Sequence, residues 1–462
     1  MTGRVFARLE ARLDAGRAEP VALALSGGGD SMALLHLAAD WARANGRRVL
    51  ALTVDHNLNP MSADWTRFAG EAARAVGADW RGLSWDEAKA GHERESGLTA
   101  RARAARHGLI AEAARAAGAR VVLLAQTADD VAEADWMRAR GSTLGRVREW
   151  SPSPVWPEGW GLMLLRPLLE ERREALRDYL RARGQEWIED PANADVRFGR
   201  SRARAALGAR AGDDPARFSV IPGPVPGIQT LDDEGPCGDG STSRAVSLDP
   251  RDKPEGDGNN RIPRCEPSPV AWAGVLEVSR DVSGSALAAA LLCAGGGVVP
   301  PRGERLAALR ARLAGGENFT AGLAGARVEA AGASVLLMRE PGEMRRRAPG
   351  VVRLTPGAAA VWDGRFEIVA TEPGWRVEAA AGRLARLSEA DRRAIAGLPP
   401  TARGGLPVLI RDGEEAPILA WRRATVRALG GRRLGLALGE TTQEADLFHP
   451  MHGETPPTDL FS

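Results

Sequence analysis

Six consecutive residues near the N-terminus have the composition of a phosphate-binding loop. An apolar run of strand length precedes them, and apolar residues at helical spacing follow. Three successive glycines leave backbone N–H groups open to a ligand, and the dipole of the following helix favours an anion there. We expect these residues to bind the phosphates of a nucleotide; a glycine-rich turn without a ligand is the alternative. They are Ser26, Gly27, Gly28, Gly29, Asp30 and Ser31.

A second group of candidate residues is acidic. Asp129, Asp130 and Glu133 follow an apolar run at 121–125 and open a helical pattern at 129–140. Carboxylates at a helix N-terminus can hold Mg²⁺ beside phosphates, and they can equally cap the helix. Both roles are open from the residues alone. Their predicted place at the same sheet edge as the glycine loop favours the metal or substrate site.

Two weaker signals accompany these groups. Asp55 and His56 end another apolar run, a position where polar residues are common in many α/β folds. Arg103 and Arg106 lie on a helical segment at 98–117. Arginines at this spacing can clamp a phosphate, or they can form an ordinary solvated face.

The elements that must position these residues alternate in the manner of parallel βαβ units. Strands are expected at 21–25, 49–54 and 121–125, with a weaker one at 78–85, and helices at 32–45, 63–76, 98–117 and 129–140. We therefore expect residues 1–212 to form one doubly wound α/β domain with a parallel sheet. Ligands bind such sheets beyond the carboxyl ends of the strands. The glycine loop and the acidic group both lie there.

The rest of the chain divides into a connection and a smaller α+β region. Residues 220–269 are dense in Pro, Gly, Asp and Ser without a hydrophobic period, so we expect a disordered insertion with no catalytic role. Two further domains are expected at 270–341 and at 342–462, the latter with a flexible tail. The expected helices cover 271–292, 302–314 and 380–398, and the expected strands cover 326–330, 334–339, 364–370 and 375–378.

Composition limits the class of partner. The net charge is +2 over 462 residues, so attraction for nucleic acid must come from local arginine clusters. The three cysteines, Cys237, Cys265 and Cys293, have no metal-like spacing. No apolar run approaches the ~20 residues of a membrane helix, and the N-terminus lacks the apolar core of a signal peptide. We expect no membrane partner and a cytoplasmic location.

Together these segments resemble one family, the PP-loop ATP pyrophosphatases, and within it the bacterial tRNA(Ile)-lysidine synthases. SGGGDS matches the family's SGGxDS loop, and QTADDVAEADWMRARGS is similar to HTADDQAETxLMRLxRGS. VDHNLNPMSADW and ARAARHGLI resemble VDHGLRPxS and ARxxRYxxL. The most specific match is IEDPANADVRFGRSRARAAL, which resembles EDPSNxDxxFxRxRxR. Its matching residues are Asp190, Pro191, Asn193, Phe198, Arg200, Arg202 and Arg204.

The resemblance implies a ligase that forms a carbon–nitrogen bond. In that family, ATP adenylates the C2 carbonyl oxygen of the first anticodon cytidine of an isoleucine tRNA with a CAU anticodon, and pyrophosphate leaves. The amine of free L-lysine then attacks C2 and displaces AMP, which gives lysidine. Because the carbonyl is a poor electrophile before adenylation, the protein must mainly position groups and neutralise charge. ATP and Mg²⁺ are the implied cofactors, and a homodimer is one assembly compatible with this resemblance.

The same resemblance implies a role for each candidate residue. The glycine loop and Asp55 would bind ATP. Asp30, Asp130 and Glu133 would hold Mg²⁺ or meet the incoming amine, and catalytic roles would fall to Asp30, Asp130 and Arg103. The domain at 270–341 would contact tRNA. The side chains expected to bind tRNA are Arg106, Arg200, Arg202 and Arg204.

The chain departs from the family pattern inside the site. Gln126 stands where relatives carry a histidine, so we expect a hydrogen bond there and no base. This departure and the insertion motivate an alternative, a noncatalytic ATP-sensing RNA-binding protein. A sibling PP-loop enzyme that thiolates tRNA is a second alternative. No cysteine precedes Cys237, which argues against thiolation.

Overall fold

The computed structural model describes the chain in several stretches. They are residues 1–57, 60–85, 98–142, 147–152, 161–189, 199–211, 270–297, 301–346, 348–449, 453–457 and 460–461. The predicted insertion at 220–269 lies outside them, as do residues 190–198 of the family signature. Among the described residues, no helix is both long and apolar enough to span a membrane.

The chain forms two compact units. The first consists of Met1–Val220 and Thr441–His449, and the second of Ile221–Glu440 and Pro450–Ser462. The predicted boundary between 270–341 and 342–462 lies inside the second unit. The short segment Thr441–His449 was expected in the C-terminal domain, whereas it packs within the first unit.

The first unit is built on a six-stranded sheet in the order β3-β2-β1-β4-β6-β5. Neighbouring strands run parallel except β5, which is antiparallel to β6. The strands are β1 (Val21–Ala24), β2 (Val49–Asp55), β3 (Asp79–Ser84), β4 (Val121–Leu123), β5 (Trp150–Pro152) and β6 (Met163–Leu165). The predicted doubly wound α/β fold is confirmed. The strand order reverses direction between β1 and β4, which makes the crevice beyond these two strands the expected ligand site.

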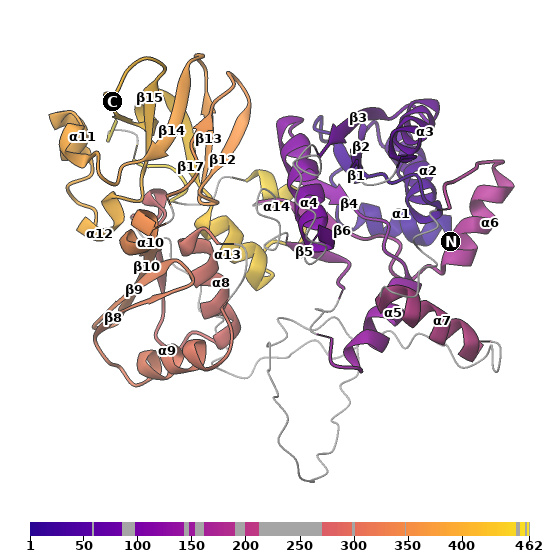
Figure 1. Ribbon diagram of the computed structural model, residues 1–462, viewed down its shortest axis with the longest axis horizontal. Coiled ribbons are helices and arrows are strands. Elements are labelled where there is room, and N and C mark those ends of the chain that lie inside the picture. Colours follow the sequence, from indigo (N-terminus) through magenta and orange to yellow (C-terminus); the bar gives the residue numbers. More distant parts are fainter. Residues whose placement is uncertain are drawn as a thin grey trace, which may run out of the picture. The chain divides into compact units, whose positions relative to one another are not determined.

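Helices cover both faces of this sheet. Figure 1 shows α4 on one side of the strands and α2 and α3 on the other. Apolar side chains of α4, including Ile110, pack on Leu52 and Val122 of the strands. The helices are α1 (Thr2–Glu10), α2 (Gly29–Ala44), α3 (Ser62–Ala75), α4 (Leu98–Ala116), α5 (Ala128–Arg138), α6 (Arg173–Ala182) and α7 (Gly199–Ala211).

The second unit contains three antiparallel sheets. Their strand orders are β7-β10-β9-β8, β11-β14-β15-β16 and β12-β13-β17. The strands are β7 (Leu276–Val278), β8 (Phe319–Leu323), β9 (Ala326–Ala331), β10 (Ser334–Arg339), β11 (Val352–Arg353), β12 (Ala359–Trp362), β13 (Phe366–Ala370), β14 (Trp375–Ala379), β15 (Pro407–Arg411), β16 (Ile418–Leu419) and β17 (Ala424–Ala428). The main helices are α8 (Gly284–Gly295), α9 (Glu304–Ala314), α10 (Pro341–Arg346), α11 (Glu389–Ala394), α12 (Pro400–Arg403) and α13 (Gly430–Leu438).

Two predicted helices of the second unit are wrong. The stretch at 271–292 contains β7 as well as α8, because Gly274 adopts φ 75° and Ser283 caps a new helix by accepting from the N–H of Ala286. The stretch at 380–398 contains a single turn of 3-10 helix at Leu384–Arg386 and the short helix α11, which begins after its cap Ser388. Gly382, with φ 77°, already leaves the helical region. Alanine-rich composition suggested longer helices than the caps and glycines permit.

A buried ion pair anchors Thr441–His449 in the first unit. Arg47 donates from Nη1 to Glu444 Oε2 at 2.9 Å and from Nη2 to Glu444 Oε1 at 3.0 Å, and both side chains are 0% exposed. The backbone N–H of Asp14 donates to the same carboxylate at 2.9 Å. Glu444 begins the short helix α14 (Glu444–Phe448), whose Phe448 ring lies under the guanidinium of Arg17.

Removing the cation of this pair should destabilise the first unit strongly. Arg47→Met leaves Glu444 buried and unpaired, which costs about 3–5 kcal/mol. Arg48→Met is the matched control, because its ion pair with Asp79 is more than half exposed on both sides and is worth at most about 1 kcal/mol. Hydrogen exchange of the β1 and β2 amides measures both variants. Equal loss of protection in the two would contradict the assigned difference.

Candidate active site

The glycine loop joins β1 to α2 at the carboxyl edge of the sheet. Ser31 Oγ donates to the carbonyl oxygen of Gly28 at 2.9 Å and accepts from the N–H of Ser26 at 3.2 Å. The two serine hydroxyl oxygens lie 3.1 Å apart. Helix α2 begins at Gly29, so the loop leads directly into the positive end of a helix dipole. The six residues predicted to bind phosphate therefore form the turn and the first three residues of α2.

Residues Trp187 and Ile188 lie beside the glycine loop, and only Gly27 has a conformational and packing reason to be glycine there. Gly27 has φ 82°, and a Cβ there would lie 2.4 Å from Ile188 Cδ1. A Cβ on Gly29 would lie 3.4 Å from the indole of Trp187. The N–H of Ile188 donates to the carbonyl oxygen of Gly27 at 2.9 Å. The segment just before the family signature thus packs directly on the loop.

The two carboxylate oxygens of Asp130 have different roles: one caps helix α5 and the other faces the candidate site. Oδ2 accepts from the backbone N–H of Thr127 at 2.8 Å and from its hydroxyl at 2.9 Å, which completes a capping box at the start of α5. Oδ1 faces Arg173 and Arg200, at 3.5 and 3.7 Å. Helix capping, one of the two predicted roles, is therefore present. The second oxygen remains directed at the site.

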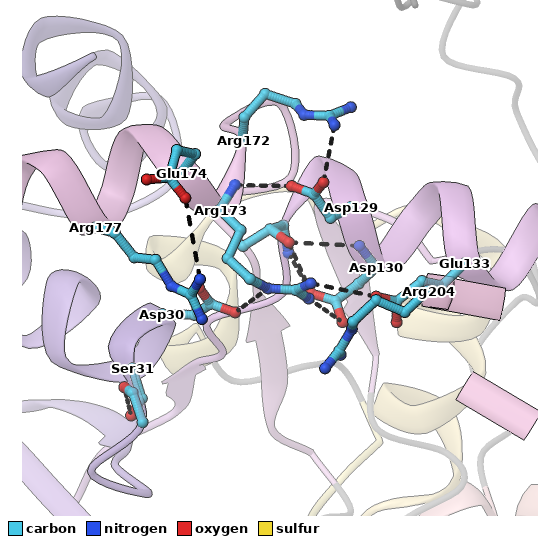
Figure 2. A network of polar contacts seen from close by, with 12 residues as sticks. Asp30, Ser31, Asp129, Asp130, Glu133, Arg172, Arg173, Glu174, Arg177 and Arg204 are labelled. Carbon is cyan, nitrogen blue, oxygen red and sulfur yellow. Dashed lines mark hydrogen bonds and ion pairs between the residues drawn. The ribbon is translucent and has the colours of Figure 1, made fainter. Parts of the chain in front are cut away.

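Arg173 joins the acidic residues of two helices. Its Nε donates to Asp30 Oδ2 at 3.1 Å, its Nη1 to Glu133 Oε1 at 3.3 Å, and its Nη2 to Asp130 Oδ1 at 3.5 Å. Figure 2 shows the guanidinium of Arg173 between these carboxylates. Asp129 fixes the start of α6, because its Oδ2 accepts from the backbone N–H of Arg173 at 2.7 Å. The three residues predicted as metal ligands are thus gathered around an internal cation.

The same interactions shift the ionisation of the pair at the centre. Burial raises the pKa of Asp30, nearby Asp130 adds to the rise, and Arg173 opposes it. Burial lowers the pKa of Arg173, but Asp30, Asp130 and Glu133 outweigh it and raise the value overall. The three carboxylates therefore favour the charged form of Arg173.

Helix α7 brings two of the predicted tRNA-binding arginines to this network. Arg204 Nε donates to Glu133 Oε1 at 2.9 Å, and Arg200 approaches Asp130. They are one helical turn apart on α7, which packs along α5. Arg202 lies between them in sequence and is exposed. Arg200 and Arg204 therefore pair with carboxylates inside the protein.

Helix α4 supplies a second, basic group near the site. Arg106 Nε donates to His56 Nε2 at 2.9 Å, which keeps that imidazole neutral. Burial, and after it Arg200 and Arg106, lower the pKa of Arg103. Asp55 ends β2, and its Oδ1 accepts from the N–H of Asn57 at 2.8 Å. Arg103 and Arg106 thus lie in the first half of α4, and Asp55 lies at the end of β2.

Gln126 has the role expected of it. Its Oε1 accepts a hydrogen bond from Arg166 Nε. Arg166 also donates to the carbonyl oxygen of Arg148 at 2.9 Å and to Ser151 Oγ at 2.7 Å. Burial, together with Arg103, lowers the pKa of Arg166 to about 10. The prediction of a hydrogen bond in place of a base is confirmed.

Sequence reasoning missed Arg173 and Arg166. Arg166 directly follows β6, a three-residue strand that the apolar pattern did not reveal. Arg173 is the first residue of α6 and follows Arg172, the helix cap. Two arginines at a helix N-terminus oppose the helix dipole, and this unfavourable placement was the available signal for a nearby acidic cluster.

Comparison with known proteins identifies the family. A model described as a PP-loop domain matches residues 2–211. A protein of Caulobacter vibrioides described as tRNA(Ile)-lysidine synthase is 43% identical over 451 residues, which cover 96% of this chain and 98% of that protein. The chain belongs to the tRNA(Ile)-lysidine synthase family.

Two further relatives carry the same description. Those from Hyphomonas neptunium and Mesorhizobium japonicum are 34% and 33% identical, and the matches cover 77% and 85% of this chain and 90% and 82% of theirs. The predictions of a PP-loop domain that uses ATP and of a carbon–nitrogen ligase in tRNA modification are confirmed. These matches favour that function over a noncatalytic RNA-binding protein and over a thiolating sibling.

The half-buried imidazole of His56 should make stability depend on pH. Burial, with Arg106, lowers its pKa from 6.5 to about 4. Between these values the unfolded chain takes up a proton that the folded state refuses, so stability falls as pH falls through this window. NMR titration of the ring C–H signals should show no protonation of His56 until near pH 4. His56→Gln should flatten the pH dependence of unfolding in the same window, and a slope equal to wild type would contradict this.

Proposed function

We propose that the carboxyl edge between β1 and β4 performs both half-reactions of lysidine formation on an isoleucine tRNA with a CAU anticodon. The observation that carries this proposal is the convergence of the glycine loop with Asp30, Asp130 and Glu133 at one topological switch point. Such a crevice binds nucleotides in doubly wound sheets. If the glycine loop and the acidic residues lay at opposite edges of the sheet, they could not act on the same substrate.

The glycine loop would bind the phosphates of ATP. Its backbone N–H groups and the Ser26 and Ser31 hydroxyls lie at the start of α2, where an anion is stabilised by the helix dipole. Asp55, at the end of the neighbouring strand β2, would contact the rest of the nucleotide. In this placement, the departing pyrophosphate stays in the loop while the α-phosphate faces the carboxylates.

Mg²⁺ fits the acidic residues by donor type. Carboxylate oxygens are its preferred protein ligands, and those of Asp30 and Asp130 already converge on one cation, the guanidinium of Arg173. Asp30 and Asp130 would hold the ion, with Glu133 buried behind them. When bound, Mg²⁺ would neutralise charge on the phosphate oxygens. Among the described residues, no group of three or more His, Cys, Asp or Glu is placed so that it could hold a metal ion.

In the proposed reaction the protein mainly positions the reacting groups and forms no covalent intermediate with them. The C2 carbonyl oxygen of the cytidine attacks the α-phosphorus, an oxygen–phosphorus bond forms, and pyrophosphate leaves. The ε-amine of free L-lysine attacks C2, the carbon–oxygen bond to AMP breaks, and the amine loses a proton. The acidic residues would attract the lysine ammonium before this step. Charge neutralisation and orientation of this kind account for much of enzymatic catalysis.

Arginines around the crevice would bind the anticodon loop. Arg103 and Arg106 of α4 and Arg200, Arg202 and Arg204 of α7 flank the acidic residues from two helices. RNA-reading proteins generally act on unstacked loop bases, which suits an anticodon. The homodimer, the cytoplasmic location and the tRNA contacts of 270–341 remain predictions, and sedimentation of the full chain tests the first.

Replacing Asp30 should abolish lysidine formation without unfolding the protein. Asp30→Ala removes a carboxylate that meets Arg173 at the loop, and we expect a loss of at least about 10²-fold, as for other groups that stabilise developing charge. Asp40→Ala is the matched control, because Asp40 lies on the same helix and pairs with Arg43 and Arg183 outside the site. Labelled lysine incorporated into tRNA is the measurement. Turnover equal to that of the control would eliminate the assigned role.

Pyrophosphate release tests the proposed reaction itself. Release should require ATP and tRNA, and accumulation of lysidine should further require free lysine. Release from ATP and tRNA that produces no modified cytidine, with or without lysine, would contradict the proposed reaction.

A further inference from the structure

Asp30, Asp130 and Glu133 are held together by a cation that belongs to the protein. Each nitrogen of the Arg173 guanidinium reaches a different carboxylate, at 3.1 to 3.5 Å (Figure 2). The carboxylates come from α2 and α5, while Arg173 begins α6. The guanidinium therefore occupies the place where three acidic groups from two helices converge.

The position of Arg173 is set by these acids rather than by its own helix. A cation in the first turn of a helix opposes the dipole. Its backbone N–H is nevertheless fixed by Asp129 at 2.7 Å, and its side chain is only 17% exposed. The electrostatic attraction of three carboxylates outweighs the helix preference and the loss of hydration.

Glu133 gives a second and independent indication of a ligand. Its side chain is 2% exposed, and Oε1 accepts from both Arg173 and Arg204. Oε2 is buried and has no hydrogen-bond partner among the described residues. A buried carboxylate oxygen without a partner is costly, so this atom calls for a further donor or cation.

We propose that Arg173 is a positioning residue that takes the place of the divalent cation when none is bound, so that an incoming cation must compete with it. The inference rests on the proposed function, which assigns that cation to Asp30 and Asp130. Arg173 keeps the carboxylates convergent between turnovers. Its charge also weakens binding of a free cation, which favours arrival of the metal together with the phosphates of ATP.

Direct binding of Mn²⁺ to the full chain in the absence of ATP tests this competition. Electron paramagnetic resonance of free Mn²⁺ measures the affinity. Arg173→Met removes the charge and keeps an apolar stem, so Mn²⁺ should bind about tenfold more tightly or better, because repulsion from a unit charge at contact distance is lost. Arg173→Gln is a second neutral variant with the same expectation. Arg173→Lys keeps the charge and should stay within about threefold of wild type.

Arg172→Met is the matched control for loss of one positive charge. Arg172 is adjacent, is 51% exposed and pairs with Asp129, outside the acidic trio. Its replacement should leave Mn²⁺ affinity within about twofold of wild type. Circular dichroism establishes that each variant is folded. Unchanged or weaker Mn²⁺ binding in both neutral variants of Arg173 would overturn the inference.

Asp30→Asn separates failure of this inference from failure of the proposed metal site. In the Arg173→Met background it should remove the gain in Mn²⁺ affinity. If it changes nothing there, the metal is bound elsewhere and the proposed site fails. If Asp30→Asn weakens Mn²⁺ binding but the neutral variants of Arg173 do not strengthen it, the metal site stands and the competition does not. In turnover, Arg173→Met should lower kcat and also lower the Mg²⁺ concentration needed for half-maximal rate.

Discussion

Carboxylates repel one another over the few ångströms that separate them at the carboxyl edge of this sheet, and a cation must lie between them. Arg173 supplies it for Asp30, Asp130 and Glu133. Each of these residues is in the first turns of a helix, so the charge balance also fixes how α2, α5 and α6 meet. Helix α7 adds Arg204 to the same balance. Pairing of opposite charges, as well as packing of side chains, therefore determines the geometry of the crevice.

The sheet topology explains why these helices meet at all. Strand order reverses between β1 and β4, so the helices that follow these two strands diverge and their N-termini face a common crevice. The N-termini of both helices favour an anion there. Asp130 contributes both to helix capping and to the candidate site, because one carboxylate oxygen caps α5 and the other faces Arg173. The two interpretations that the residues alone left open, capping and site, are compatible in one side chain.

Local patterns predicted the parts of this arrangement that are local. The apolar runs gave β1, β2 and β4, and the glycine triplet with its helix gave the loop. Arg173 could not be found this way, because its bond to Asp30 spans 143 positions. The pair of Arg47 and Glu444 spans 397 positions and brings a C-terminal segment into the first unit. Nothing in the composition of 441–449 indicates that partner.

The errors have equally specific causes. Strands β5 and β6 are three residues long, too short to show a period. The stretches at 271–292 and 380–398 are rich in alanine, which favours a helix in isolation. Gly274 and Gly382 have positive φ, which interrupts a helix at each place. Residues beside them join the sheets of the second unit instead. Tertiary context overrode propensity at both places.

The arginines near the crevice fall into two groups, and the difference matters for a chain with a net charge of only +2. Arg173, Arg200 and Arg204 are neutralised by carboxylates of α2 and α5. Arg106 and Arg166 donate instead to His56 and to Gln126, neutral acceptors that leave their charge in place. Attraction for the polyanionic substrate proposed above must come from charge that is not already neutralised. Among the described residues, Arg106 and Arg166 are therefore the side chains that we propose for this attraction, in addition to any contact that Arg200 and Arg204 make with RNA while they hold the carboxylates in place.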